Sequence, residues 1–263
     1  IGYEDNRKLG EIAGAYAINS RLAMDRFSDE SLVRSMNTLP GIRFEERSQT
    51  SYRLSIRGSS LRAPFGVRNV KVYWNNIPYT DANGNTPLNL LDLNNIGRIE
   101  IIRGPAGSVY GAGIGGVLNM YNETMPPKPI SGDIGYTAGS FGYQKYLANL
   151  NLAGDNHRFS VRYANQSGDG YRDHSRSERE VFQAEGSFFV TARQTISANI
   201  LYSDLFYQTP GGLTQSQYNE NPRQARPGAS RQNSSIDQQN IFMGISNEYD
   251  FNDKLKNTTS LFY

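Results

Sequence analysis

The pattern of apolar and polar positions changes its period partway along the chain. From about residue 131 onward, apolar side chains occupy every second position, as at Ile196, Ala198 and Ile200, with Ser197 and Asn199 between them. A period of two predicts a β-strand with one apolar and one polar face. Seven such strands are expected, at about 132–139, 144–153, 158–166, 181–191, 195–205, 239–251 and 255–263.

The connections between these strands alternate in length. Tight turns near 154–156, 192–194 and 252–254 alternate with a polar loop at 167–180 and a longer one at 206–238. This sorting, with strands close to the 9–11 residues that cross a bilayer, is typical of a membrane β-barrel. Seven strands leave two open edges in lipid, and a lumen that holds a folded plug needs about 22 strands. We therefore expect the front of a longer protein, ending in mid-barrel at Tyr263.

The first part of the chain has short apolar runs and Gly-rich turns. A helix is expected after an N-cap at Ser28, ending at Pro40-Gly41, with short strands near 54–56, 70–74, 99–102 and 117–120. This pattern predicts a small α+β domain. Prolines at 126, 127 and 129 predict a linker, because proline fits neither a helix interior nor a central strand. The expected domains are residues 1–125, a Pro-rich linker at 126–130, and residues 131–263.

Composition excludes several function classes. The chain has 263 residues and no Cys, which excludes disulfides, thiolate nucleophiles and Cys-ligated metals. Its 27 basic and 25 acidic residues give a net charge of +2, which predicts no nucleic-acid partner. Its two His, His157 and His174, fall in or beside expected turns, and no Ser elbow is present. We therefore expect no enzyme, no cofactor and no metal site.

Two motifs imitate known sites. Gly111 to Gly116 satisfies G-x-G-x-x-G, but an expected strand follows where a dinucleotide site needs a helix. Asp81-x-Asn83-x-Asn85 imitates a calcium loop, but Thr86 stands where that loop requires Gly. Neither is assigned as a site.

Five segments in the first part carry a more specific signal, and they occur in a fixed order. They are Leu39-Pro40-Gly41-Ile42, Ser55-Ile56-Arg57-Gly58, Val70 to Asp81, Ile99 to Gly111, and Gly115 to Asn119. Together they resemble the plug domain of TonB-dependent outer-membrane receptors. The chain departs from that pattern at Asn75-Asn76, where the family usually has Asp-Gly. The expected fold is β-rich, a small α+β plug domain followed by antiparallel strands of an incomplete transmembrane β-barrel.

The resemblance implies a transport function. A receptor in the outer membrane of a Gram-negative bacterium would bind an extracellular ligand, contact membrane lipid and import the ligand with energy from the TonB–ExbB–ExbD complex. The energy-coupling box is not recognisable before residue 12 and is expected upstream. A ferric chelate, either a siderophore or ferric citrate, is the expected cargo. A glycan, vitamin or peptide importer of the same family is the alternative, and a secreted β-rich binding module is the alternative from another class.

The resemblance also implies roles for particular residues. The residues expected at the interface between plug and barrel are Arg57, Gly58, Arg103 and Gly104. The two arginines would pair with carboxylates on the inner barrel wall. The alternative is that they have only local partners. Two apical loops would face the ligand, because arginine, aromatic and amide groups suit an anionic chelate. Their candidate residues are Ser60, Arg62, Phe65 and Arg68 in the first loop and Tyr79, Asn83 and Asn85 in the second. An ordinary polar turn is the alternative for the second loop.

Overall fold

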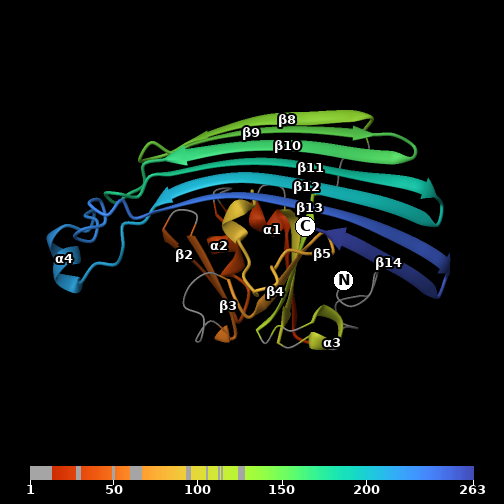
Figure 1. The fold of residues 1–263 in the computed structure, drawn as a ribbon, viewed down its shortest axis with the longest axis horizontal. Helices are drawn as coiled ribbons and strands as arrows, with labels where there is room; N and C mark the ends of the chain where they lie inside the picture. The colour runs from red at the N-terminus through yellow and green to blue at the C-terminus, as the bar shows by residue number, and fades with distance from the viewer. Residues whose placement is uncertain are drawn as a thin grey trace. The chain divides into compact units, whose positions relative to one another are not determined.

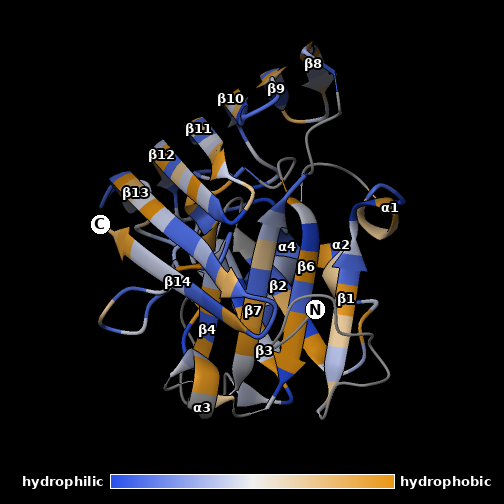
Figure 2. Ribbon diagram, turned by 90° about the vertical axis from the view of Figure 1, so that its right-hand side faces the viewer, coloured by the Kyte–Doolittle hydropathy of each residue, from blue (hydrophilic) through white to orange (hydrophobic). Residues whose placement is uncertain are grey.

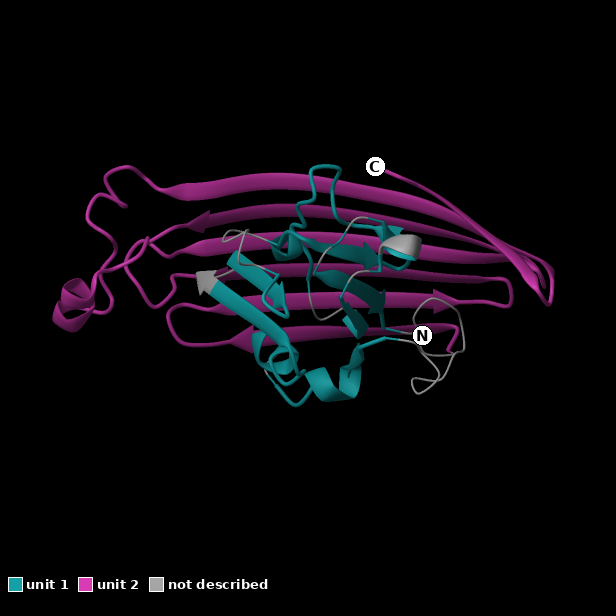
Figure 3. Ribbon diagram, turned by 90° about the horizontal axis from the view of Figure 1, so that it is seen from below, with its two compact units in different colours: residues 1–47, 51–124 teal, residues 48–50, 125–263 magenta. Residues whose placement is uncertain are grey.

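The computed structural model describes residues 14–27, 31–48, 51–59, 67–92, 96–104, 106–111, 113, 115–123 and 128–263. The chain divides into two compact units, residues 1–47 with 51–124, and residues 48–50 with 125–263 (Figure 3). Among the described residues, no helix is both long enough and apolar enough to span a membrane.

A five-stranded sheet forms the centre of the first unit. Its order is β1 (Tyr16–Ser20), β6 (Ile96–Arg103), β7 (Gly116–Asn122), β4 (Val70–Trp74) and β5 (Ile77–Pro78). β4 and β7 are parallel, and the other pairs are antiparallel. Val72, Trp74, Ile99 and Ile101 are completely buried, and in β4 the buried positions alternate with the half-buried Lys71 and Tyr73.

Short elements complete the first unit. They are α1 (Arg21–Met24), α2 (Val33–Met36), the pair β2 (Ile42–Ser48) and β3 (Ser51–Ile56), the 3₁₀ turn Leu88–Leu90, and α3 (Gly107–Tyr110). The sequence predicted strands within β3, β4, β6 and β7 but missed β1, β2 and β5. The predicted helix is described only as the single turn α2, and its predicted cap, Ser28, lies outside the described residues.

The second unit is one curved antiparallel sheet whose strands pair in chain order (Figure 1). The strands are β8 (Ile130–Ala138), β9 (Gln144–Ala153), β10 (His157–Gly168), β11 (Ser177–Thr191), β12 (Gln194–Gln208), β13 (Ser235–Asn252) and β14 (Leu255–Phe262). All seven predicted strands are confirmed, and so is the fold class. β11 and β13 extend further than predicted, because backbone pairing continues through polar residues such as Ser235, which lies opposite Gln208.

Many apolar side chains of this sheet are exposed and share one face. Phe188 is 51% exposed, Val190 53%, Ile200 44% and Ile245 48%, whereas Gln183 and Asn199, on the alternate parity, are buried. The alternation is visible along β11, β12 and β13 in Figure 2. A continuous exposed apolar face of this kind is uncommon on the surface of a water-soluble monomer.

Antiparallel order sorts the connections between the strands. Residues 139–143, 169–176 and 209–234 lie at one end of the sheet, and 154–156, 192–193 and 253–254 lie at the other. The longest connection carries α4 (Gln215–Glu220), which begins with a capping box at Thr214 and Gln217.

Candidate functional site

Several predicted residues gather at one end of the five-stranded sheet. β6 ends at Arg103, which lies opposite Gly116 at the start of β7, and Gly116 in turn lies beside Val70 at the start of β4. A side chain on Gly116 would overlap the carbonyl oxygen of Ile102, and its φ of 136° also favours glycine. This end of the sheet is the candidate site in the first unit.

Arg103 ties three backbone segments together at this end. Its guanidinium donates to the carbonyl oxygens of Pro40 at 2.7 Å, Tyr16 at 2.9 Å and Ala15 at 3.5 Å. Its backbone N–H also donates to Ala15 at 2.9 Å. Neutral carbonyls satisfy the N–H groups without cancelling the positive charge, so Arg103 can still attract a carboxylate.

Arg57 lies close to Arg103. Its φ of 49° is left-handed, and its N–H donates to the carbonyl of Gly41 at 2.8 Å. A Cβ on Gly41 would lie 3.6 Å from Cγ of Arg57 and 3.9 Å from Cδ of Arg103, so the two arginines flank Gly41. Gly58 and Gly104 follow them with φ of 80° and 124°. The predicted pairing of these arginines with barrel carboxylates stays a prediction.

The second predicted ligand loop, residues 79–87, folds back on the start of β4. Thr86 donates its N–H to the carbonyl of Val67 at 3.1 Å, and the hydroxyls of Thr80 and Thr86 are 2.8 Å apart. Tyr79 is 5% exposed, and its hydroxyl donates to the carbonyl of Pro87 at 3.1 Å. Burial raises the pKa of Tyr79 above its ordinary value. The structure therefore places Tyr79 beneath the loop as support, not on its surface.

Two predicted ligand residues from different loops meet here. Nε of Arg68 donates to Oδ1 of Asn85 at 2.6 Å. Asn85 is held in turn by Asp81, whose carboxylate accepts the N–H of Asn85 at 2.8 Å. Arg68, Asp81 and Asn83 are exposed and Asn85 is half-buried. Three further candidates, Ser60, Arg62 and Phe65, lie outside the described residues.

The sequence did not predict a group of hydrogen bonds beside this loop, in which Asn69 links Ser59 to Gly115. The side-chain amide of Asn69 donates to the carbonyl of Ser59 at 3.2 Å, and the carbonyl of Asn69 accepts from Gly115 at 2.8 Å. Ser59 Oγ also accepts the N–H of Ile56 at 3.1 Å. Asn69 has a φ of 63°, a conformation that Asn tolerates better than most residues. An Asn immediately before an apolar strand was the available signal.

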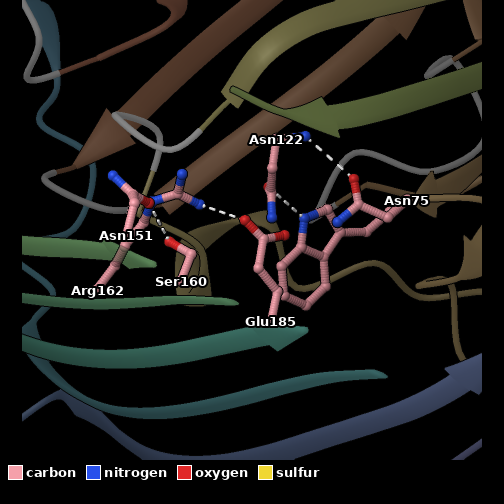
Figure 4. A network of polar contacts seen from close by, with 7 residues as sticks. Asn75, Asn122, Asn151, Ser160, Arg162 and Glu185 are labelled. Atoms are coloured by element: carbon pink, nitrogen blue, oxygen red, sulfur yellow. Dashed lines mark hydrogen bonds and ion pairs between the residues drawn. The ribbon is translucent and has the colours of Figure 1, made fainter. Parts of the chain in front are cut away.

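The Asn75-Asn76 departure is accommodated without distortion. Both residues are left-handed, with φ of 47° and 65°, as the tight turn from β4 to β5 requires. Oδ1 of Asn75 accepts the N–H of Asn122 at 3.1 Å, and Oδ1 of Asn122 accepts from the indole of Trp74 at 2.8 Å (Figure 4). The two asparagines therefore supply the backbone shape of the turn, and Asn75 adds a hydrogen bond to β7.

The second unit carries its own charged network on the polar parity of the sheet. Arg162 on β10 and Glu185 on β11 form an ion pair at 2.8 Å, with side chains only 8% and 12% exposed (Figure 4). Next to it, Ser160 donates to Asn151 at 2.7 Å. Arg179 donates to Gln166 at 2.9 Å, and both of these residues are buried. Among the residues that the structure describes, no group of three or more His, Cys, Asp or Glu could hold a metal ion.

Comparison with known proteins finds a family match within the first unit. Residues 8–117 match the family model of the TonB-dependent receptor plug domain. The resemblance drawn from the sequence motifs is therefore confirmed over that range. Receptors with this plug domain are transporters rather than enzymes as a rule, and they lie in the outer membrane of Gram-negative bacteria.

Solved structures extend the likeness over most of the chain. The ferric citrate transporter FecA in its unliganded form has a TM-score of 0.80 at 20% identity and covers 96% of this chain. The siderophore receptor PirA from Acinetobacter baumannii has a TM-score of 0.67 at 16% identity and covers 94% of this chain. The alcaligin outer-membrane receptor FauA from Bordetella pertussis has a TM-score of 0.67 at 16% identity and covers 96% of this chain. The chain spans only 39–40% of the length of these three proteins. At such identities the likeness establishes the fold.

Proposed function

We propose that this chain is the plug and the first barrel strands of an outer-membrane receptor that imports a ferric chelate. The receptor would draw energy from the TonB–ExbB–ExbD complex and act by binding and transport, without catalysis. The observation that carries this proposal is the succession of a plug domain and a sheet whose apolar face is exposed. Exposure of that face is what contact with membrane lipid requires.

The proposed ligand site is the exposed loop surface around Arg68 and Asn85. These residues offer guanidinium and amide donors on a loop that internal hydrogen bonds already hold in shape. Charge-assisted hydrogen bonds from such donors suit the carboxylate or hydroxamate oxygens of a ferric chelate. FecA, PirA and FauA, which share the fold, are described as a ferric citrate transporter, a siderophore receptor and an alcaligin receptor. Asn83 and the first loop, with Ser60, Arg62 and Phe65, belong to the same proposal.

Arg57 and Arg103 are proposed to link ligand binding to transport. They project from the same end of the sheet as the ligand loop. Pairing with carboxylates on the inner barrel wall would hold the plug until force from the periplasmic side loosens it. Polar and partly hydrated contacts of this kind can exchange partners more readily than an apolar interface.

Uptake by the complete receptor tests the proposal. A receptor-deficient bacterium expressing it would be given radiolabelled iron as citrate or as several siderophores, with and without a proton uncoupler. We expect uncoupler-sensitive accumulation of one chelate. If none accumulates although the protein is in the outer membrane, the cargo is a glycan, vitamin or peptide. If the protein is not in the membrane fraction, a secreted β-rich binding module becomes the better account.

A further inference from the structure

Three connections at the α4 end of the second unit form one hydrogen-bonded group. We name residues 139–143, 169–176 and 209–234 the loop cluster. Asp169 donates its N–H to the carbonyl of Phe141 at 2.8 Å, and Asp173 donates to that of Arg223 at 2.7 Å. A ring nitrogen of His174 lies 2.9 Å from the carbonyl oxygen of Ser234. Each connection is therefore bonded to at least one of the others.

Arg172 makes the most extensive of these links. Its guanidinium reaches the carbonyl of Gly211 at 2.7 Å, that of Pro210 at 3.5 Å, and that of Gln224 through two nitrogens at 2.8 and 3.1 Å. One side chain thereby fixes both the beginning of the longest connection and its return. Arg172 is itself held in place, because Ser175 donates its hydroxyl to the Arg172 carbonyl.

A second arginine joins the aromatic side chains of the cluster. Nε of Arg223 donates to the carbonyl of Tyr171 at 3.2 Å, and its guanidinium lies 5.7 Å from the ring centroids of both Phe141 and Tyr171. The two rings pack edge to face at 5.5 Å. Phe141 and His174 have left-handed φ of 60° and 57°, which persist only where surrounding contacts impose them. The cluster thus holds an aromatic–guanidinium group in one arrangement.

We infer that Arg172 is a positioning residue, which keeps the three connections together as one preformed platform. In the proposed receptor this platform would meet the ligand on the cell surface. A surface already ordered before binding loses less conformational entropy when a ligand arrives. Arg172 suits the role because its planar fork reaches several carbonyls at once, which a lysine ammonium cannot do in the same geometry.

Hydrogen exchange of the complete receptor in detergent, without ligand, tests this inference. In Arg172→Gln we expect amide exchange at least about tenfold faster in all three connections, including 139–143, which Arg172 does not bond directly. Peptides from the middle of β12 should be unchanged. Arg172→Lys should fall between Arg172→Gln and the parent. Arg231→Gln, at an exposed arginine of the same connection, serves as the matched control and should leave every rate unchanged.

Faster exchange in 209–226 alone, or no change anywhere, would overturn the inference, because Arg172 would then be a local contact. Loss of protection across the whole sheet would show a folding defect in Arg172→Gln. In that case Arg172→Lys is the deciding variant, and its amide exchange must still be faster in all three connections than in the parent. No ligand is used, so the result stands apart from that of the uptake experiment, although the platform's purpose rests on the proposed function.

Discussion

The two sheets of this chain differ in the burial of their apolar side chains. In the five-stranded sheet, Val72, Ile99 and Ile101 are completely buried. In the seven-stranded sheet, Ile200 is 44% exposed while its neighbour Leu201 is completely buried. Both sheets obey one rule, which is that apolar groups avoid water. The difference is explained if the exposed apolar face of the second sheet meets lipid, as proposed above.

The charged residues follow the same division. The Arg162–Glu185 pair lies on the polar parity of the second sheet, away from the exposed apolar rows. In the first unit Arg103 sits at a sheet end, where backbone carbonyls are available to it. The charged side chains thus lie where they have hydrogen-bonding partners. Substitutions that remove or add a charged or an apolar side chain test each contrast between the units.

Breaking the ion pair should have the largest effect. Glu185→Leu leaves the largely buried Arg162 without its carboxylate, and we expect a loss of about 3–5 kcal/mol in the free energy of unfolding. Urea unfolding of the complete receptor from liposomes measures it.

The double variant Arg162→Met with Glu185→Leu is the control, because it removes both charges. It should be much closer to the parent than Glu185→Leu alone. Equal losses in the single and double variants would mean that packing at these positions matters rather than unpaired charge.

Truncating an isoleucine should separate the two sheets. Ile101→Ala empties a packed core position and should destabilise the plug by about 2–5 kcal/mol. Ile200→Ala removes a similar volume from an exposed position and should cost well under half of that. Hydrogen exchange of peptides from β6 and β12 would report the two effects separately. Similar losses at both positions would contradict the assignment of opposite faces.

Although Ile200 should tolerate truncation, it should not tolerate a charged side chain. Ile200→Lys would place an ammonium in the apolar band and should cost about 2–4 kcal/mol if this position lies near the bilayer midplane. The yield of heat-modifiable protein in outer membranes measures it. Ser216→Lys, on an exposed position of α4, is the control and should insert normally. Normal insertion of both variants would argue against lipid contact at Ile200.

Removing the Arg103 side chain should have a smaller effect on stability. Arg103→Ala loses three carbonyl contacts, and we expect a loss of about 1–3 kcal/mol in plug stability. Energy-dependent uptake should fall while surface binding of the chelate stays nearly intact. Arg34→Ala, at an exposed arginine on α2, is the control. Equal loss of binding and uptake would assign Arg103 to the plug fold alone.

The sequence predicted the seven strands of the second unit well, because alternation with a period of two indicates the two faces of a strand directly. It missed the ends of β11 and β13, where pairing continues beyond the apolar residues. β1 and β5 were missed because they are short and are defined by their neighbours in the sheet. Motifs located Arg57 and Arg103, but only the fold brings them together around Gly41. The Arg68–Asn85 contact joins residues 17 positions apart, which no local pattern predicts.

The most direct test of the lipid-facing assignment uses the absence of Cys from the chain. Single cysteines at positions 198 to 203, introduced into a cysteine-free version of the complete receptor, would carry a fluorophore in liposomes containing brominated lipid. We expect strong quenching at 198, 200 and 202 and weak quenching at 199, 201 and 203. Uniform quenching, or quenching of the opposite parity, would contradict the account.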